Sequence, residues 1–135
     1  RQVLKLTEQP AAFRFIYPDD MSLKDKINSV VQNVYSGEGT DYLPAASKEL
    51  DRLEQLGYGR LPVCLAKTQY SFSDNPALLG RPHGFRVTVK SVRLAAGAGF
   101  VVALTGDIMT MPGLPKIPAA ESIDVDENGK ISGLF

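Results

Sequence analysis

Residues 61–66 place the strongest constraint on how this chain can fold. Leucine, proline, valine, cysteine, leucine and alanine follow one another there, so the run is apolar on both faces that a strand would present. This pattern predicts a strand covered on both sides, as in a parallel sheet with helices packed above and below. A stretch with alternating polarity begins at Phe85, and residues 100–104 form a second apolar run of strand length.

Two amphipathic helices are predicted before these strands. Ser22 can cap the first helix, with Asp25 at the reciprocal position of a capping box, and apolar residues recur every three or four positions up to Val34. Gly37 is a natural stop for that helix. A second helix is predicted from Pro44 to just before residue 57, a glycine.

The end of the chain is predicted to form a hairpin, because Asn128 and Gly129 lie between short apolar arms. The fold class expected from these patterns is α/β: a buried, mostly parallel sheet flanked by helices, with a C-terminal β-hairpin. The 135 residues are treated as one domain.

Composition argues against several classes of function. Fifteen basic residues balance fifteen acidic ones, so no long-range field is expected to attract nucleic acid or an anionic membrane. No apolar run approaches the length of roughly 18 residues that a membrane span needs. The single cysteine, Cys64, has no partner for an internal disulfide, and we expect a cytoplasmic protein.

Residues 67–84 form the most informative segment. They follow the apolar strand directly, at the position where open α/β sheets bind ligands, and no regular structure is predicted in them. Their lysine, arginine, hydroxyl, tyrosine and aspartate side chains could bind an anion and a hydrogen-bonding heterocycle. The alternative is a surface loop that packs on its own apolar residues, Phe72, Leu78 and Leu79.

Other motifs carry weaker signals. No glycine-rich loop precedes Lys67, so a phosphate-binding cradle is not predicted there, and Gly97 with Gly99 is better explained by a bulge or close backbone packing. Residues 124–129 match the first half of a calcium-binding loop, but the closing position is Phe135, which favours a hairpin. Cys64 is expected to be a packed core thiol, and with one cysteine and one histidine, His83, no metal site is predicted.

Several long segments, taken together, carry a resemblance to a known family. Residues 61–74, 79–82, 93–100, 105–116 and 133–135 resemble, in the same order, the C-terminal region of bacterial-type formate–tetrahydrofolate ligases, also called formyltetrahydrofolate synthetases. The resemblance extends over essentially the whole chain and is looser before residue 60.

The resemblance implies an ATP-dependent carbon–nitrogen ligase of one-carbon metabolism. In this family formate is phosphorylated to formyl phosphate, and the amine of tetrahydrofolate then attacks the activated carbonyl. The family's glycine-rich phosphate loop lies near the N-terminus of a much longer chain and has no counterpart in these 135 residues. We therefore expect the chain alone to have no ligase activity, no catalytic residue and no tightly bound ATP or tetrahydrofolate.

Its expected partners are the N-terminal ATP-binding domains of the parent chain. Family members are usually tetramers, so homo-oligomerisation is a further expectation.

Residues of the first loop are the predicted substrate contacts. They are Lys67, Thr68, Gln69, Tyr70, Ser71, Ser73, Asp74 and Arg81, with Gly97 and Gly99 allowing close backbone approach. Residues 109–115 could line the same cleft or dock other domains. Two alternatives remain open at this point: a non-catalytic interaction or oligomerisation module, and weak residual binding of adenine nucleotide or folate.

Overall fold

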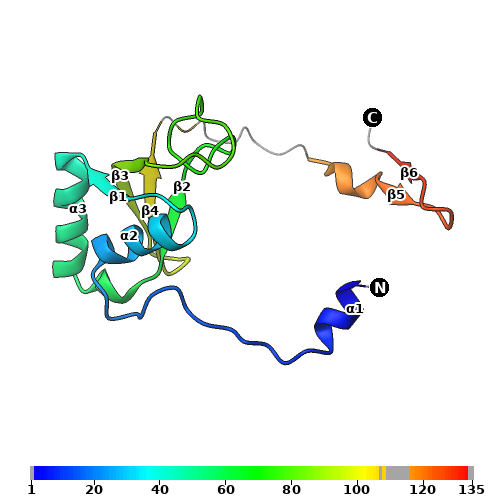
Figure 1. Cartoon of the computed structure of the whole chain (residues 1–135), viewed down its shortest axis with the longest axis horizontal. Coiled ribbons are helices and arrows are strands. Elements are labelled where there is room, and N and C mark those ends of the chain that lie inside the picture. Colours follow the sequence, from blue (N-terminus) through cyan, green and yellow to red (C-terminus); the bar gives the residue numbers. More distant parts are fainter. Residues whose placement is uncertain (1, 107, 109–115, 134–135) are drawn as a thin grey trace.

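The computed structural model describes residues 2–106, 108 and 116–133. Its helices and strands follow one another along the chain as shown in Figure 1. They are α1 (Gln2–Thr7), α2 (Leu23–Asn33), β1 (Gly39–Tyr42), α3 (Pro44–Gln55), η1 (Tyr58–Arg60), β2 (Val63–Ala66), β3 (Arg86–Ala95), β4 (Phe100–Thr105), η2 (Ala119–Glu121), β5 (Asp124–Val125) and β6 (Ile131–Ser132).

Four strands form the central sheet in the order β1-β3-β4-β2. β1 pairs in parallel with β3, and β2 in parallel with β4, while β3 and β4 form an antiparallel hairpin. Two of the three pairings are therefore parallel. The predicted class, a mostly parallel sheet flanked by helices, is confirmed. β1 was not predicted, because Gly-Thr-Asp-Tyr is short and has no apolar pattern.

One face of the sheet packs against both α2 and α3. The buried cluster joins Leu23 and Ile27 of α2 to a second helix and two strands. Its other fully buried members are Ala46, Leu50 and Leu53 of α3, Val89 of β3, and Val101 and Ala103 of β4. We call this the covered face. Each helix has one apolar stripe, so burying both stripes on the same sheet face gives the domain its core.

Lys26 is buried within this layer although it is a lysine. Its ammonium group donates hydrogen bonds to the carbonyl oxygens of Gly59 (2.8 Å) and Leu61 (3.1 Å). Burial lowers the pKa of Lys26, because the charged form loses its hydration. The side chain thus ties α2 to the segment that leads into β2.

Local signals explain where the helices begin and end. Ser22 caps α2 by accepting the backbone N–H of Asp25, and Pro44 occupies the first turn of α3, both as predicted. Gly57 has the left-handed φ of 88° expected after α3. The left-handed residue after α2 is Ser36 rather than Gly37. Gly37 is needed for space instead, because a Cβ there would lie 2.8 Å from Val31 Cγ1.

The opposite face of the sheet, which we call the open face, has no helix over it in the described residues. The register assigns to it Asp41 of β1, Cys64 and Ala66 of β2, Arg86, Thr88, Ser91, Arg93 and Ala95 of β3, and Phe100, Val102 and Leu104 of β4. Cys64 is exposed, so its prediction as a packed core thiol is wrong. The physical reason is that β2 is an edge strand and that both helices cover the other face.

The two ends of the described chain lie away from this body (Figure 1). Every side chain in residues 2–16 and 116–133 is exposed, including Phe13, Phe15 and Ile131. β5 and β6 pair in antiparallel fashion around a turn at Gly129, which confirms the C-terminal hairpin. Asp126 accepts the backbone N–H groups of Asn128 and Lys130, so this aspartate closes the turn. None of the helices in the described part of the chain is long and apolar enough to cross a membrane.

Candidate functional site

The loop of residues 67–84 connects the end of β2 to the start of β3. It folds back on itself, because Phe72 N donates to Gly80 O (2.9 Å) and Gly80 N donates to Tyr70 O (3.0 Å). Residues 70–72 therefore lie beside Gly80, and the loop has a defined shape without a helix or a regular strand pair. A long loop with internal hydrogen bonds is typical of functional loops.

Two of the predicted contact residues, Ser71 and Ser73, are buried inside the loop. Ser71 Oγ accepts the backbone N–H of Ser73 (3.0 Å) and lies 3.1 Å from Ser73 Oγ. Ser73 Oγ in turn accepts the backbone N–H of Asn75 (3.0 Å). In this structure both hydroxyl groups hold the loop together and do not face solvent.

Lys67 has a similar internal role in this structure. Its ammonium group donates to the carbonyl oxygens of Thr68 and Ser71 and lies 5.2 Å from the ring centroid of Tyr35. Tyr35 also stacks on Phe72, with ring centroids 6.1 Å apart. Burial lowers the pKa of Lys67, and the Asp74 carboxylate partly offsets that effect. The lysine thus fastens the loop to the chain that follows α2. Thr68 Oγ1 accepts the N–H of Tyr70 at 3.3 Å.

Asp74 joins the loop to the end of the sheet. Its Oδ2 accepts the backbone N–H of Thr88 (2.8 Å). Gly106, which follows β4, lies against the same residue: a Cβ at Gly106 would sit 2.8 Å from Asp74 O, and its φ is 63°. Only glycine fits both restrictions without strain. The two segments that carry most of the family resemblance therefore meet at Asp74 and Gly106, beside a hollow that Lys90 also lines.

The outward side of the loop carries Gln69, Tyr70 and Arg81. These three side chains are exposed, and they line a shallow hollow together with Phe72. Arg81 Nη2 donates to Ser36 Oγ at 3.1 Å, which places the guanidinium group beside the segment after α2. An amide, an aromatic ring and a guanidinium group in one hollow can bind a planar ring and an anion.

Gly97 and Gly99 do not lie with the loop. They form the turn at the far end of the β3–β4 hairpin, and all of β4 separates them from Gly106. Gly99 has a φ of 74°, and its N–H donates to Ala95 O at 2.9 Å, so it shapes the turn. A Cβ at Gly97 would meet no atom within 4 Å.

Sequence reasoning missed Tyr35 and Gly106 as parts of this arrangement. Tyr35 gave no signal, because its contact with Lys67 depends on how α2 packs. Gly106 did have a sequence signal, because it lies in residues 105–116, one of the segments that carry the family resemblance. Residues 109–115 lie outside the described residues. Within the described ranges, no three His, Cys, Asp or Glu side chains are placed together as a metal site would need.

Comparison with known proteins decides the family. The model of the family described as formate–tetrahydrofolate ligase matches residues 1–135, which is every residue of the chain. The chain belongs to the formate–tetrahydrofolate ligase family. A curated formate–tetrahydrofolate ligase from Symbiobacterium thermophilum is 60% identical over 135 residues. That alignment includes 100% of this chain and 24% of the relative, so the chain spans about a quarter of the length of the ligase it matches.

Proposed function

We propose that this chain supplies the C-terminal part of a ligase that uses ATP to join formate to tetrahydrofolate through formyl phosphate. The observation that carries the proposal is the match of the whole chain to the ligase family, at 60% identity to one curated ligase. The contact between Asp74 and Gly106 supports it, because it holds the two segments that carry most of the family resemblance beside each other.

The proposed contribution of the chain is binding rather than chemistry. Formate is a poor electrophile, and phosphorylation provides the leaving group that the folate amine displaces. Such phosphoryl transfer relies on backbone amides and a lysine around the phosphates, and the 135 residues contain no glycine-rich loop for that purpose. We propose that the outward side of the loop, with Gln69, Tyr70 and Arg81, lines part of the substrate cleft.

The test uses the isolated chain and a chimaera in which it replaces the matched quarter of the S. thermophilum ligase. The chimaera is expected to form formyltetrahydrofolate in a reaction that requires ATP, formate and tetrahydrofolate, and the isolated chain is expected to form none. Product from the isolated chain would show that these residues contain a complete active site. A folded but inactive chimaera would contradict the proposed contribution.

Variants of the chimaera test the loop. Tyr70→Ala and Arg81→Ala are each expected to raise the KM for ATP or tetrahydrofolate by about tenfold, equivalent to about 1.4 kcal/mol of binding. Leu78→Ala is the matched control, because Leu78 is exposed on the same loop and outside the hollow. A KM that is equal in all three variants would place the substrate cleft elsewhere.

A second candidate is a non-catalytic interaction or oligomerisation module. The exposed apolar side chains of residues 2–16 and 116–133 favour it, because isolated apolar segments gain free energy by docking. Light scattering of the isolated chain measures self-association, and calorimetry with ATP and with tetrahydrofolate measures residual binding. A monomer that releases no heat with either ligand would exclude both self-association and residual binding.

A further inference from the structure

The open face of the sheet combines apolar and basic side chains in separate halves. Val102 and Leu104 of β4 lie beside Cys64 and Ala66 of β2, and the register pairs Val102 with Cys64 and Leu104 with Ala66. All four side chains are partly or fully accessible. The half formed by β2 and β4 is therefore an accessible apolar surface.

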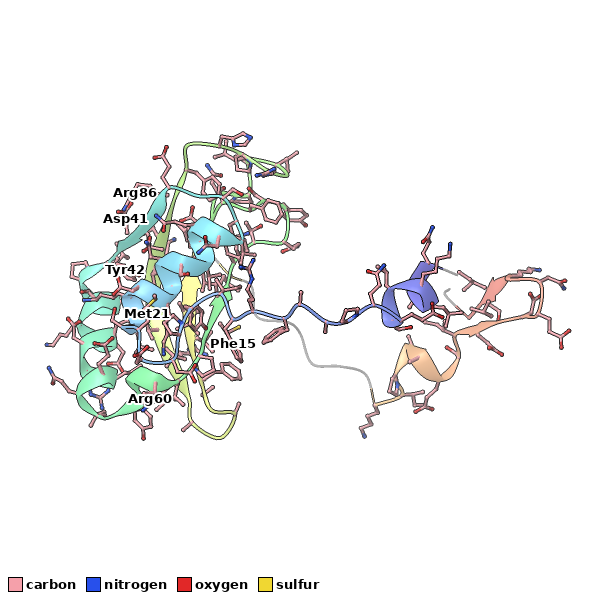
Figure 2. All side chains as sticks on the ribbon, turned by 60° about the horizontal axis from the view of Figure 1, so that its bottom comes forward. Phe15, Met21, Asp41, Tyr42, Arg60 and Arg86 are labelled. Carbon is pink, nitrogen blue, oxygen red and sulfur yellow. The ribbon has the colours of Figure 1, made fainter. Side chains whose placement is uncertain are left out.

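The other half, formed by β1 and β3, is polar with an excess of positive charge. Arg86 forms a bidentate ion pair with Asp41, at 2.8 to 3.0 Å (Figure 2). Arg93 is exposed farther along β3. β1 and β3 carry three exposed basic side chains, Arg86, Lys90 and Arg93, and one exposed aspartate, Asp41, which pairs with Arg86.

All-parallel sheets occur almost only with both faces buried, because their strands carry apolar residues on both sides. The sheet in this chain is mixed, and its two outer pairings, β1 with β3 and β2 with β4, are parallel. Here β2 and β4 follow that rule in their composition, yet in the described residues helices cover only one face. The sequence of β2 and β4 is therefore typical of a sheet with a layer packed on each face. In the described residues the sheet has a helical layer on one face only.

We propose that the open face docks the part of a formate–tetrahydrofolate ligase chain that lies outside the 135 matched residues. This inference rests on the proposed function. About three quarters of the S. thermophilum ligase has no counterpart in this chain, which supplies enough polypeptide for a third layer. The docking segment has an apolar centre that packs on Val102 and Leu104, and carboxylates at its border that face Arg93. The excess of basic groups favours such a surface over a second copy of this chain, which would bring the same arginines.

Cys64 provides a native probe for this surface. It is the only cysteine of the chain, it is exposed, and it lies in the apolar half of the open face. The rate of maleimide labelling at Cys64 is measured by peptide mass spectrometry, in the isolated chain and in the chimaera described above. We expect labelling in the chimaera to be slower by about tenfold or more, because a buried thiol is shielded and harder to ionise. Equal rates would overturn the proposal.

A charged substitution tests the same surface from another side. Val102→Glu in the chimaera is expected to restore rapid labelling of Cys64, because it places a carboxylate in the apolar contact. Val34→Glu is the matched control, since Val34 is 44% exposed at the end of α2, in the helical layer, and should leave Cys64 protected. If Val102→Glu does not fold, the comparison of the unsubstituted chimaera with the isolated chain still decides the matter. Protection of Cys64 in the isolated chain that rises with its concentration would identify a second copy as the occupant and overturn the proposal.

The labelling of Cys64 tests the docking surface whether or not the chimaera is catalytically active. An inactive chimaera with a protected Cys64 would contradict the proposed function and leave the docking surface standing. An active chimaera with freely reactive Cys64 would support the proposed function and overturn the docking surface.

Discussion

Val101 and Val102 are neighbours in β4 with identical side chains and opposite surroundings. Val101 is completely buried on the covered face, in the same cluster as Leu23 and Leu50. Val102 points to the open face, beside Cys64, and remains partly accessible. Residue type therefore does not decide burial here. Burial depends on whether another element packs on that face of the sheet. In the described residues α2 and α3 both pack on the face that holds Val101.

The first prediction compares these two valines directly. Val101→Ala should lower the free energy of unfolding by about 3 kcal/mol, because it removes buried carbon and leaves a cavity. Val102→Ala should lower it by less than about 1 kcal/mol, as for other accessible positions. Urea denaturation of the isolated chain measures both. Similar losses would show that the open face is packed in this chain alone, and the distinction between the faces would fail.

The second prediction concerns the point where the loop contacts the end of the sheet. Gly106→Ala should destabilise the chain by about 2 kcal/mol, because Gly106 has a positive φ and because a Cβ would press on Asp74 O. Gly97→Ala is the control, since a Cβ at that position would meet no atom within 4 Å. Thermal unfolding followed by circular dichroism compares the two. Equal melting temperatures for both variants would mean that the junction at Asp74 is not tight.

The third and smallest effect belongs to the polar half of the open face. Hydrogen bonds from Arg86 lower the pKa of Asp41 below its ordinary 3.8. An aspartate with a lowered pKa in the folded state contributes stability above the unfolded-state pKa, and that contribution disappears as the pH falls through the folded-state pKa. Asp41→Asn should therefore reduce stability slightly at neutral pH and not in strong acid. Because both side chains are exposed, salt should also weaken the effect.

The measurement for Asp41 is the urea midpoint at neutral pH and at a pH well below 3.8, for the parent chain and for the variant. Arg86→Gln closes a double-mutant cycle and separates the ion pair from each single replacement. A difference between parent and variant that persists unchanged in strong acid would contradict the role of the carboxylate charge.

Local physics made much of the fold predictable. Ser22 and Pro44 mark where helices begin, because capping and the fixed φ of proline act within a few residues. The alternating polarity that begins at Phe85 predicted β3, because successive side chains of a strand point to opposite faces. Two predictions failed in the described residues, Cys64 as a core thiol and residues 61–66 as a strand covered on both sides, because both depended on contacts with distant segments.

The candidate site was predictable only as a segment. The sequence indicated residues 67–84 because a long polar loop follows an apolar strand, but it could not separate inward from outward side chains. Ser71, Ser73 and Lys67 face the inside of the loop, whereas Tyr70 and Arg81 face outward. Their directions depend on how the loop closes on Gly80 and on how Tyr35 is placed after α2.

The sequence by itself determined the family, the starts of α2 and α3, the strands from β2 onward and the hairpin. Each of these depends on residues close together in the chain or on long matching segments. Only the tertiary structure decided that both helices cover the same face and that Asp74 meets Gly106. It also showed that Gly97 and Gly99 lie in the turn between β3 and β4, at the end of the sheet opposite to the loop of residues 67–84. Those outcomes depend on packing between segments far apart in sequence, where the free energy of burial belongs to no single segment.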